Sequence, residues 1–134
     1  MQRQVEVGRA ASKGEYLCIA TFLPVRRWRN VIPFLRMNSQ VEKQLKQTPG
    51  LIRYSIRANF LRKRFWTFSV WADKASSNAF VRGEPHATAV RRFPEWAAEG
   101  AAFVEWTRGD GSINWKEALE RLKNPSFYYR GTGR

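Results

Sequence analysis

The chain has 134 residues, 43% of them hydrophobic and 14% aromatic, which fits one globular domain with a sizeable core. No segment is long and apolar enough to span a membrane, and residues 1–9 lack the apolar stretch of a secretory signal, so we expect a cytoplasmic protein with no membrane among its partners. The formal net charge of +13 favours an anionic partner of some kind: nucleic acid, anionic lipid, or a carboxylated or phosphorylated ligand.

The single cysteine, Cys18, excludes an internal disulfide and is compatible with a reducing compartment. It lies inside an apolar stretch, where a buried and unreactive thiol is the expected state. The sequence has neither a CxxC motif nor a cluster of histidine and cysteine residues, so no metal site is predicted.

In chain order, residues 1–14 are interpreted as a loose lead-in, in which the alternation at 4–7 can add an edge strand. Residues 16–23 predict the first firm strand. Its odd-numbered and even-numbered positions are both apolar, so we expect both of its faces to be covered. Asn30 is expected to cap a helix over about residues 31–47, with an apolar stripe of Phe34, Met37, Val41 and Leu45.

Residues 51–60 and 65–71 predict a β-hairpin around the basic link 61–64, with Phe60 opposite Phe65. One face of this hairpin carries an apolar core set: Ile52, Tyr54, Ile56, Ala58, Phe60, Phe65 and Trp71. The other face places cations beside large apolar side chains: Arg53, Arg57, Trp66, Phe68 and Val70. Something must therefore cover this second face or bind to it.

The rest of the main domain, which we place at residues 15–124, alternates helix and strand. Asp73 is expected to cap a helix through Phe80, and a further helical stretch begins near Pro85 or His86. Residues 101–107 predict the fourth strand, and a capping box at 114–117 opens a last helix. The tail 125–134 is expected to be mobile unless its aromatic residues dock on the domain.

This order, β-α-β-β-α-β plus a C-terminal helix, predicts an α+β domain with a ferredoxin-like antiparallel sheet. Its two main helices cover one side and leave the other side bare, with Trp66, Phe68 and Trp106 among the exposed residues. A patch of that size exceeds what soluble monomers normally expose. The simplest cover is the sheet of a second copy, so we expect a homodimer.

Three features of the sequence belong together: Pro49-Gly50-Leu51, the strand 65–71, and Asp73 before a helix that carries Phe80 and leads to His86. In these features, and over roughly residues 16–107, the chain resembles the dimeric α+β barrel superfamily, specifically the antibiotic biosynthesis monooxygenase-like proteins. The segment 67–71 and the later histidine also resemble the spheroidene monooxygenase-like branch, whose members use haem. The resemblance implies two sheets packed face to face, with a pocket between each sheet and its helices or within the barrel.

If the protein is an enzyme, the resemblance implies an oxidoreductase that acts on an aromatic or polyene substrate, with either no cofactor or haem. His86 is the candidate catalytic residue, because it is the only side chain with an ordinary pKa near neutrality, and it can equally be a structural residue at the start of its helix. The candidate ligand-binding residues are Arg53, Arg57, Trp66, Phe68, Trp71 and Phe80. The haem-degrading members place an asparagine on strand one and a tryptophan on the second helix. This chain has neither, with Phe80 at the latter position, so haem degradation of that kind is not expected.

Two alternatives stay open. An RNA recognition motif has the same topology and stacks bases on aromatic residues of its third strand, where Arg64, Trp66, Phe68 and Trp71 match part of the pattern. RNA binding would need the same face that a dimer buries, so RNA binding and dimerisation through this face exclude each other. Nucleic-acid binding is the weaker of the two hypotheses. The other alternative is a barrel that binds a small ligand without catalysis.

Overall fold

The computed structural model describes residues 1–8 and 15–131 and contains a six-stranded antiparallel sheet in the order β1-β3-β4-β2-β5-β6. The strands are β1 (Gln2–Glu6), β2 (Tyr16–Pro24), β3 (Leu51–Asn59), β4 (Arg64–Trp71), β5 (Ala102–Arg108) and β6 (Phe127–Tyr128). The four inner strands have the ferredoxin-like order, which confirms the predicted α+β fold class. The alternation predicted at 4–7 corresponds to edge strand β1, which pairs with β3.

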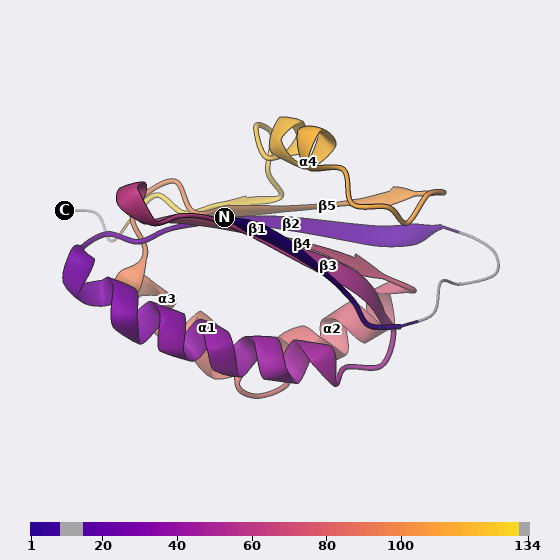
Figure 1. Cartoon of the computed structure of the whole chain (residues 1–134), viewed down its shortest axis with the longest axis horizontal. Coiled ribbons are helices and arrows are strands. Elements are labelled where there is room, and N and C mark those ends of the chain that lie inside the picture. Colours follow the sequence, from indigo (N-terminus) through magenta and orange to yellow (C-terminus); the bar gives the residue numbers. More distant parts are fainter. Residues whose placement is uncertain (9–14, 132–134) are drawn as a thin grey trace.

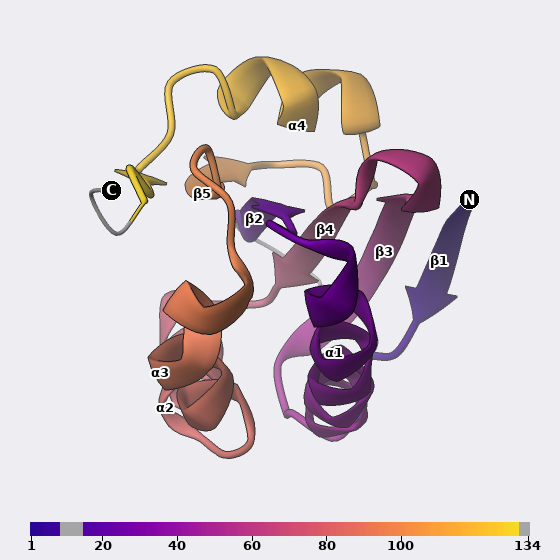
Figure 2. The ribbon, with the colours of Figure 1, turned by 90° about the vertical axis from the view of Figure 1, so that its left-hand side faces the viewer.

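The helices are α1 (Val31–Lys46), α2 (Lys74–Arg82), α3 (His86–Trp96) and α4 (Trp115–Arg121), with short 3-10 turns η1 (Trp28–Asn30) and η2 (Phe60–Arg62). Helices α1, α2 and α3 lie on one side of the sheet, and α4 lies on the opposite side (Figure 1). Viewed from the end, α1 lies beside the α2–α3 pair beneath the sheet (Figure 2), and the Phe34 ring of α1 meets the Trp96 ring of α3. The sheet therefore has three helices packed on one side and a single helix packed on the other (Figure 1).

The hairpin differs from the expected register by two residues. Ala58, not Phe60, lies opposite Phe65, because Phe60 belongs to the turn η2 and is exposed. A bulge between Leu51 and Arg53 reverses the side of Ile52, which packs into the cluster under α4 instead of beside Tyr54. A shift of two residues keeps the other side chains on the predicted faces of the sheet.

The second face of the hairpin is covered by the chain itself. Phe68 and Val70 are fully buried in a cluster with Trp106 and Ala118, and Trp115 packs against that cluster. The sequence predicted that one chain leaves this face bare. That prediction is wrong at the centre of the face, because α4 lies across it (Figure 1).

Two of the three predicted helix caps are confirmed, and the third is wrong. Asp73 accepts a hydrogen bond from the Ser76 N–H at 2.7 Å, and Asn114 accepts one from the Glu117 N–H at 3.0 Å, as predicted. Asn30 makes no such bond, because η1 runs directly into α1 and holds Asn30 in helical conformation. Pro94 lies inside α3, which continues to Trp96.

Both ends of the described chain join the sheet. Strand β6 pairs with β5, and the ring centroids of Phe93 and Tyr129 are 4.8 Å apart, so aromatic residues of the tail contact the domain. Residues 9–14 of the lead-in and 132–134 of the tail lie outside the described residues. Across 1–8 and 15–131, no helix is both long and apolar enough to cross a bilayer.

Candidate functional site

The structure separates the predicted site residues onto two sides of the sheet. Trp71, Phe80 and His86 meet on the side of α1, α2 and α3. The other four lie on the α4 side: Arg53, Arg57, Trp66 and Phe68. These seven residues therefore do not line one pocket.

The first group forms a continuous line of rings, which we call the His86 row. The Trp71 and Phe80 ring centroids are 5.6 Å apart, and those of Phe80 and His86 are 4.7 Å apart. The Trp71 indole N–H donates to the Ser69 hydroxyl at 2.9 Å. The row thus runs from the helix-facing side of the sheet to the start of α3.

His86 is held by one side-chain amide and one backbone carbonyl. Its N–H donates to the Gln44 side-chain oxygen at 2.9 Å, and its Nδ1 lies 3.2 Å from the Val81 carbonyl oxygen. Burial lowers the pKa of His86 below its ordinary value, and the Val81 carbonyl opposes this to a smaller extent. The imidazole is therefore neutral near pH 7, with the proton on Nδ1 where the carbonyl accepts it, which leaves Nε2 as the proton acceptor.

A shallow depression of about 540 Å³ opens beside the His86 row, between α1 and the α2–α3 turn. Phe80 and Pro85 supply apolar surface, and α1 supplies polar side chains that include Lys43 and Gln44. Gln44 spans the depression, since its Nε2 donates to the Phe80 carbonyl at 2.9 Å while its oxygen accepts from the His86 N–H. The depression is thus open and is lined by both apolar and polar side chains.

The layer between the sheet and α1, α2 and α3 contains polar residues that the sequence analysis did not single out. Thr21, Thr67 and Ser69 lie on the central strands β2 and β4, face the helices, and are only half-buried. The hydroxyls of Thr21 and Thr67 form a hydrogen bond with each other. A usable signal was present: Thr67 and Ser69 have the same parity as the core residues Phe65 and Trp71, where apolar side chains are the norm.

The two arginines hold α4 and its preceding loop in place. Arg53 donates to Glu6 at 2.9 Å and to the Gly111 carbonyl. The Arg57 guanidinium lies 5.2 Å from the centre of the Trp115 ring, whose N–H donates to Ser55 at 3.1 Å. Both arginines thus have intramolecular partners on the α4 side.

The Phe68 side chain is also fully used in packing within the chain. It is 0% exposed, with the rings of Trp106 and Trp115 at 5.5 and 5.8 Å. Bases therefore cannot stack on Phe68 while α4 is in place. Trp66 is half-buried and pairs with Phe22 at 5.3 Å.

Haem is the one cofactor named by the sequence resemblance, and His86 fits it in one respect. A neutral imidazole whose Nδ1–H is fixed by a carbonyl presents Nε2 in the form that ligates iron. For other metals, residues 1–8 and 15–131 hold no group of three or more His, Cys, Asp or Glu side chains arranged to bind an ion.

No protein-family model and no curated protein sequence matches this chain. Among solved structures, an antibiotic biosynthesis monooxygenase matches with a TM-score of 0.61 at 13% identity, over 72% of this chain and 99% of its own. SnoaB, a cofactor-independent oxygenase from Streptomyces nogalater, matches with 0.56 at 12% identity, over 75% and 98%. A conserved protein from Methanosarcina mazei Go1 matches with 0.60 at 12% identity, over 68% and 90%. The chain therefore has the fold of the antibiotic biosynthesis monooxygenase-like proteins, which confirms the resemblance at the level of fold.

Proposed function

We propose that the protein is a monooxygenase-like oxidoreductase that binds a small aromatic or polyene ligand against the His86 row. The observation that carries the proposal is the position of the His86 imidazole, whose Nδ1 lies 3.2 Å from the Val81 carbonyl oxygen, at the end of an aromatic line that borders an open depression. The fold likeness to proteins named as monooxygenases supports the class of reaction.

In this proposal the ring of the ligand packs on Phe80, and Nε2 of His86 accepts a phenolic proton. The resulting phenolate is electron-rich and reacts with O2. For an activated CH2 group, one oxygen atom becomes the carbonyl of the product and the other leaves as water. A positioned base of this kind contributes about 10²–10⁴-fold to a rate.

In the alternative route His86 would hold haem, and the haem would supply the activation of O2. Added haem then gives a Soret band that His86→Ala abolishes. An unchanged free-haem spectrum eliminates this route and leaves the cofactor-free one.

The cofactor-free route is tested by O2 uptake with dihydroxyanthrone, a phenolic compound with an activated CH2 group. We expect uptake that falls about a hundredfold or more in His86→Ala, while calorimetric binding of the compound changes little. Phe80→Ala should instead weaken binding, because it removes the packing surface. Binding without O2 uptake in the native chain would favour the non-catalytic ligand-binding alternative, and no binding would refute the proposal.

The homodimer and the cytoplasmic location are also parts of this proposal. A second copy would have to use the surface beside α4, where the half-buried pair Phe22 and Trp66 lies, since α4 occupies the centre of the face. Light scattering decides between one copy and two. The lone buried thiol of Cys18 supports a reducing compartment.

RNA binding through the third strand has less support than it had from sequence. Its platform needs Phe68, which is buried under α4. Single-stranded RNA binding that is lost in Trp66→Ala and Phe68→Ala would restore it.

A further inference from the structure

We propose that one end of the molecule docks on the surface of a membrane that contains anionic phospholipid. This end, which we call the basic tip, combines five cations, Arg27, Arg29, Arg62, Lys63 and Arg64, with three apolar side chains, Trp28, Ile32 and Leu61. It consists of η1, the start of α1 and the hairpin turn η2, which lie at one end of the molecule (Figures 1 and 2). The inference does not depend on the proposed oxygenase activity.

A backbone hydrogen bond and a cation–ring contact bring the two segments of the tip together. The Val25 N–H donates to the Lys63 carbonyl at 2.8 Å, directly before the segment that contains Arg27 and Trp28. The Lys63 ammonium lies 4.9 Å from the centre of the Trp28 ring. Asn59 caps η2 by accepting from the Arg62 N–H at 3.2 Å. The tip is thus an ordered part of the fold.

The charges of the tip are not neutralised within the chain. None of its five cations forms an ion pair with a carboxylate of the described residues. Elsewhere, by contrast, cations such as Arg3, Arg53 and Lys74 are paired with glutamates. The tip therefore carries a concentrated positive charge that an anionic surface can neutralise.

The apolar side chains decide which anionic surface fits. Leu61 is 87% exposed, Ile32 62% and Trp28 59%. The headgroup region of a bilayer accepts aliphatic groups and indole rings beside cations, and each apolar group transferred there strengthens binding. Nucleic acid offers phosphates but gains nothing from Leu61 and Ile32, and the Lys63 ammonium already lies over the Trp28 ring that a base would stack on.

A second copy of this chain fits the tip poorly. A symmetric contact places the same surface on both sides, so five unpaired cations would face five others. The expectation of no membrane partner rested on the lack of a spanning segment, and that criterion does not address a surface that docks from outside. Anionic lipid, one of the partner classes that the net charge favours, is the class that satisfies both the charge and the apolar groups.

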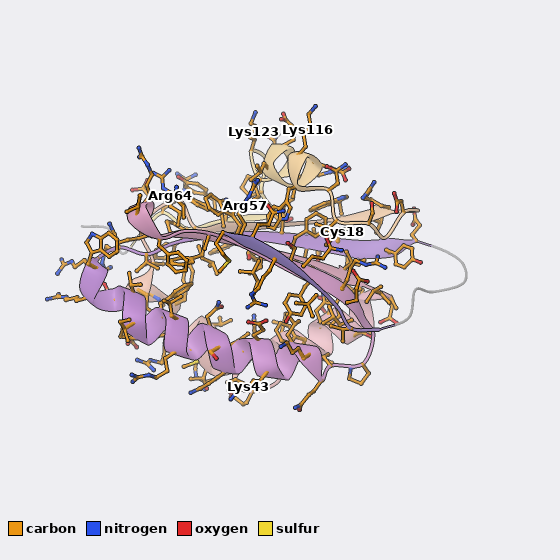
Figure 3. The ribbon with its side chains drawn as sticks, in the orientation of Figure 1. Cys18, Lys43, Arg57, Arg64, Lys116 and Lys123 are labelled. Atoms are coloured by element: carbon orange, nitrogen blue, oxygen red, sulfur yellow. The ribbon has the colours of Figure 1, made fainter. Side chains whose placement is uncertain are left out.

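Co-sedimentation with vesicles tests the proposal. Vesicles of phosphatidylcholine mixed with phosphatidylglycerol should bind the protein, vesicles of phosphatidylcholine alone should not, and salt should weaken binding. Arg62→Glu with Arg64→Glu should lower the partition coefficient about tenfold or more. The matched control is Lys116→Glu with Lys123→Glu, an equal change of charge on α4 and the turn after it, away from Arg64 (Figure 3). Leu61→Ser should weaken binding several-fold without a change of charge, whereas Val90→Ser on exposed α3 surface should not.

Each contrary outcome overturns the proposal. Equal losses in the two charge-reversal pairs would show that net charge alone drives binding. Failure of the native protein to bind anionic vesicles would remove the lipid partner. Tighter binding to a single-stranded oligonucleotide than to vesicles, unchanged by Leu61→Ser, would assign the tip to nucleic acid instead. Circular dichroism of every variant confirms that the comparison is among folded proteins.

Discussion

The two faces of the sheet are built on different principles. Under the single helix α4 the strands present Cys18, Ala20, Phe68 and Val70, all 0% exposed. Under α1, α2 and α3 the central strands present the half-buried hydroxyls of Thr21, Thr67 and Ser69. The face under α4 is thus apolar at its centre, whereas the face under three helices combines two apolar clusters with hydroxyl groups. We call the first the closed face and the second the open face, and the depression beside the His86 row lies on the side of the open face.

The largest effect expected from this difference is on the free energy of unfolding. Phe68→Ala removes a fully buried ring between Trp106 and Trp115 and should cost about 3–5 kcal/mol. Thr67→Val, one position away on the other face, removes one hydroxyl bond and should cost about 1 kcal/mol or less. Urea unfolding followed by tryptophan fluorescence measures both. Equal losses would mean that the two faces do not differ in this way.

Loss of the α4 contact should also open the closed face locally. Burial raises the pKa of the Cys18 thiol to about 11, so in the native chain it should resist thiol reagents. Trp115→Ala should destabilise the cover by about 3 kcal/mol and raise the rate of Cys18 labelling roughly a hundredfold. Trp115→Phe keeps the ring and loses only the bond to Ser55, so its effect should be smaller. Labelling at an unchanged rate in Trp115→Ala would show that α4 does not protect the thiol.

On the open side, a polar tie between β1, β3 and α1 supplements the apolar packing, and its strength depends on pH. The Arg3 guanidinium, 2.6 Å from Glu42, lowers the pKa of that carboxyl below its ordinary value of 4.5, and the buried Tyr54 hydroxyl donates to the same group. Because the folded pKa is the lower one, the stabilisation is complete above about pH 4.5 and is lost as the pH falls through the folded value. Glu42→Gln should cost about 1–2 kcal/mol at neutral pH. Its difference from the native chain should shrink in acid, and a constant difference would exclude the charged tie.

The smallest effect concerns His86, and it is simple to observe because the chain has one histidine. The proton resonance of its ring should titrate with a midpoint below the ordinary value of 6.5, and Phe80→Ala should move that midpoint upward. The neutral form is favoured by folding, so its contribution is present above about pH 6.5 and declines as the pH falls toward the folded pKa. A midpoint at or above the value found in urea would contradict the proposed base.

The sequence was sufficient for the order and face of most elements, since strand alternation and the caps at Asp73 and Asn114 depend on local chemistry. It failed where long-range packing decides. The apolar second face was recognised correctly, but nothing local says whether Phe68 is covered by a second copy or by α4. The bulge at Ile52 likewise has no sequence signal of its own.

The candidate site was predictable only in part, for the same reason. Trp71, Phe80 and His86 were named from sequence and are in contact, because they follow one another along β4, α2 and α3. Arg53 and Arg57 share a strand with core residues, and sequence alone cannot assign their partners in the α4 region. Gln44 was missed because its role depends on the distance between α1 and the α2–α3 turn.

The position of α4 along the chain also matters while the protein is being made. The four inner strands precede residues 115–121, so a ribosome releases all of them before it releases the helix that covers Phe68 and Trp106. During that interval the nascent chain exposes an apolar, aromatic surface that favours aggregation. Chaperones should therefore engage it late in translation, and a stall after β5 should leave a species prone to aggregate.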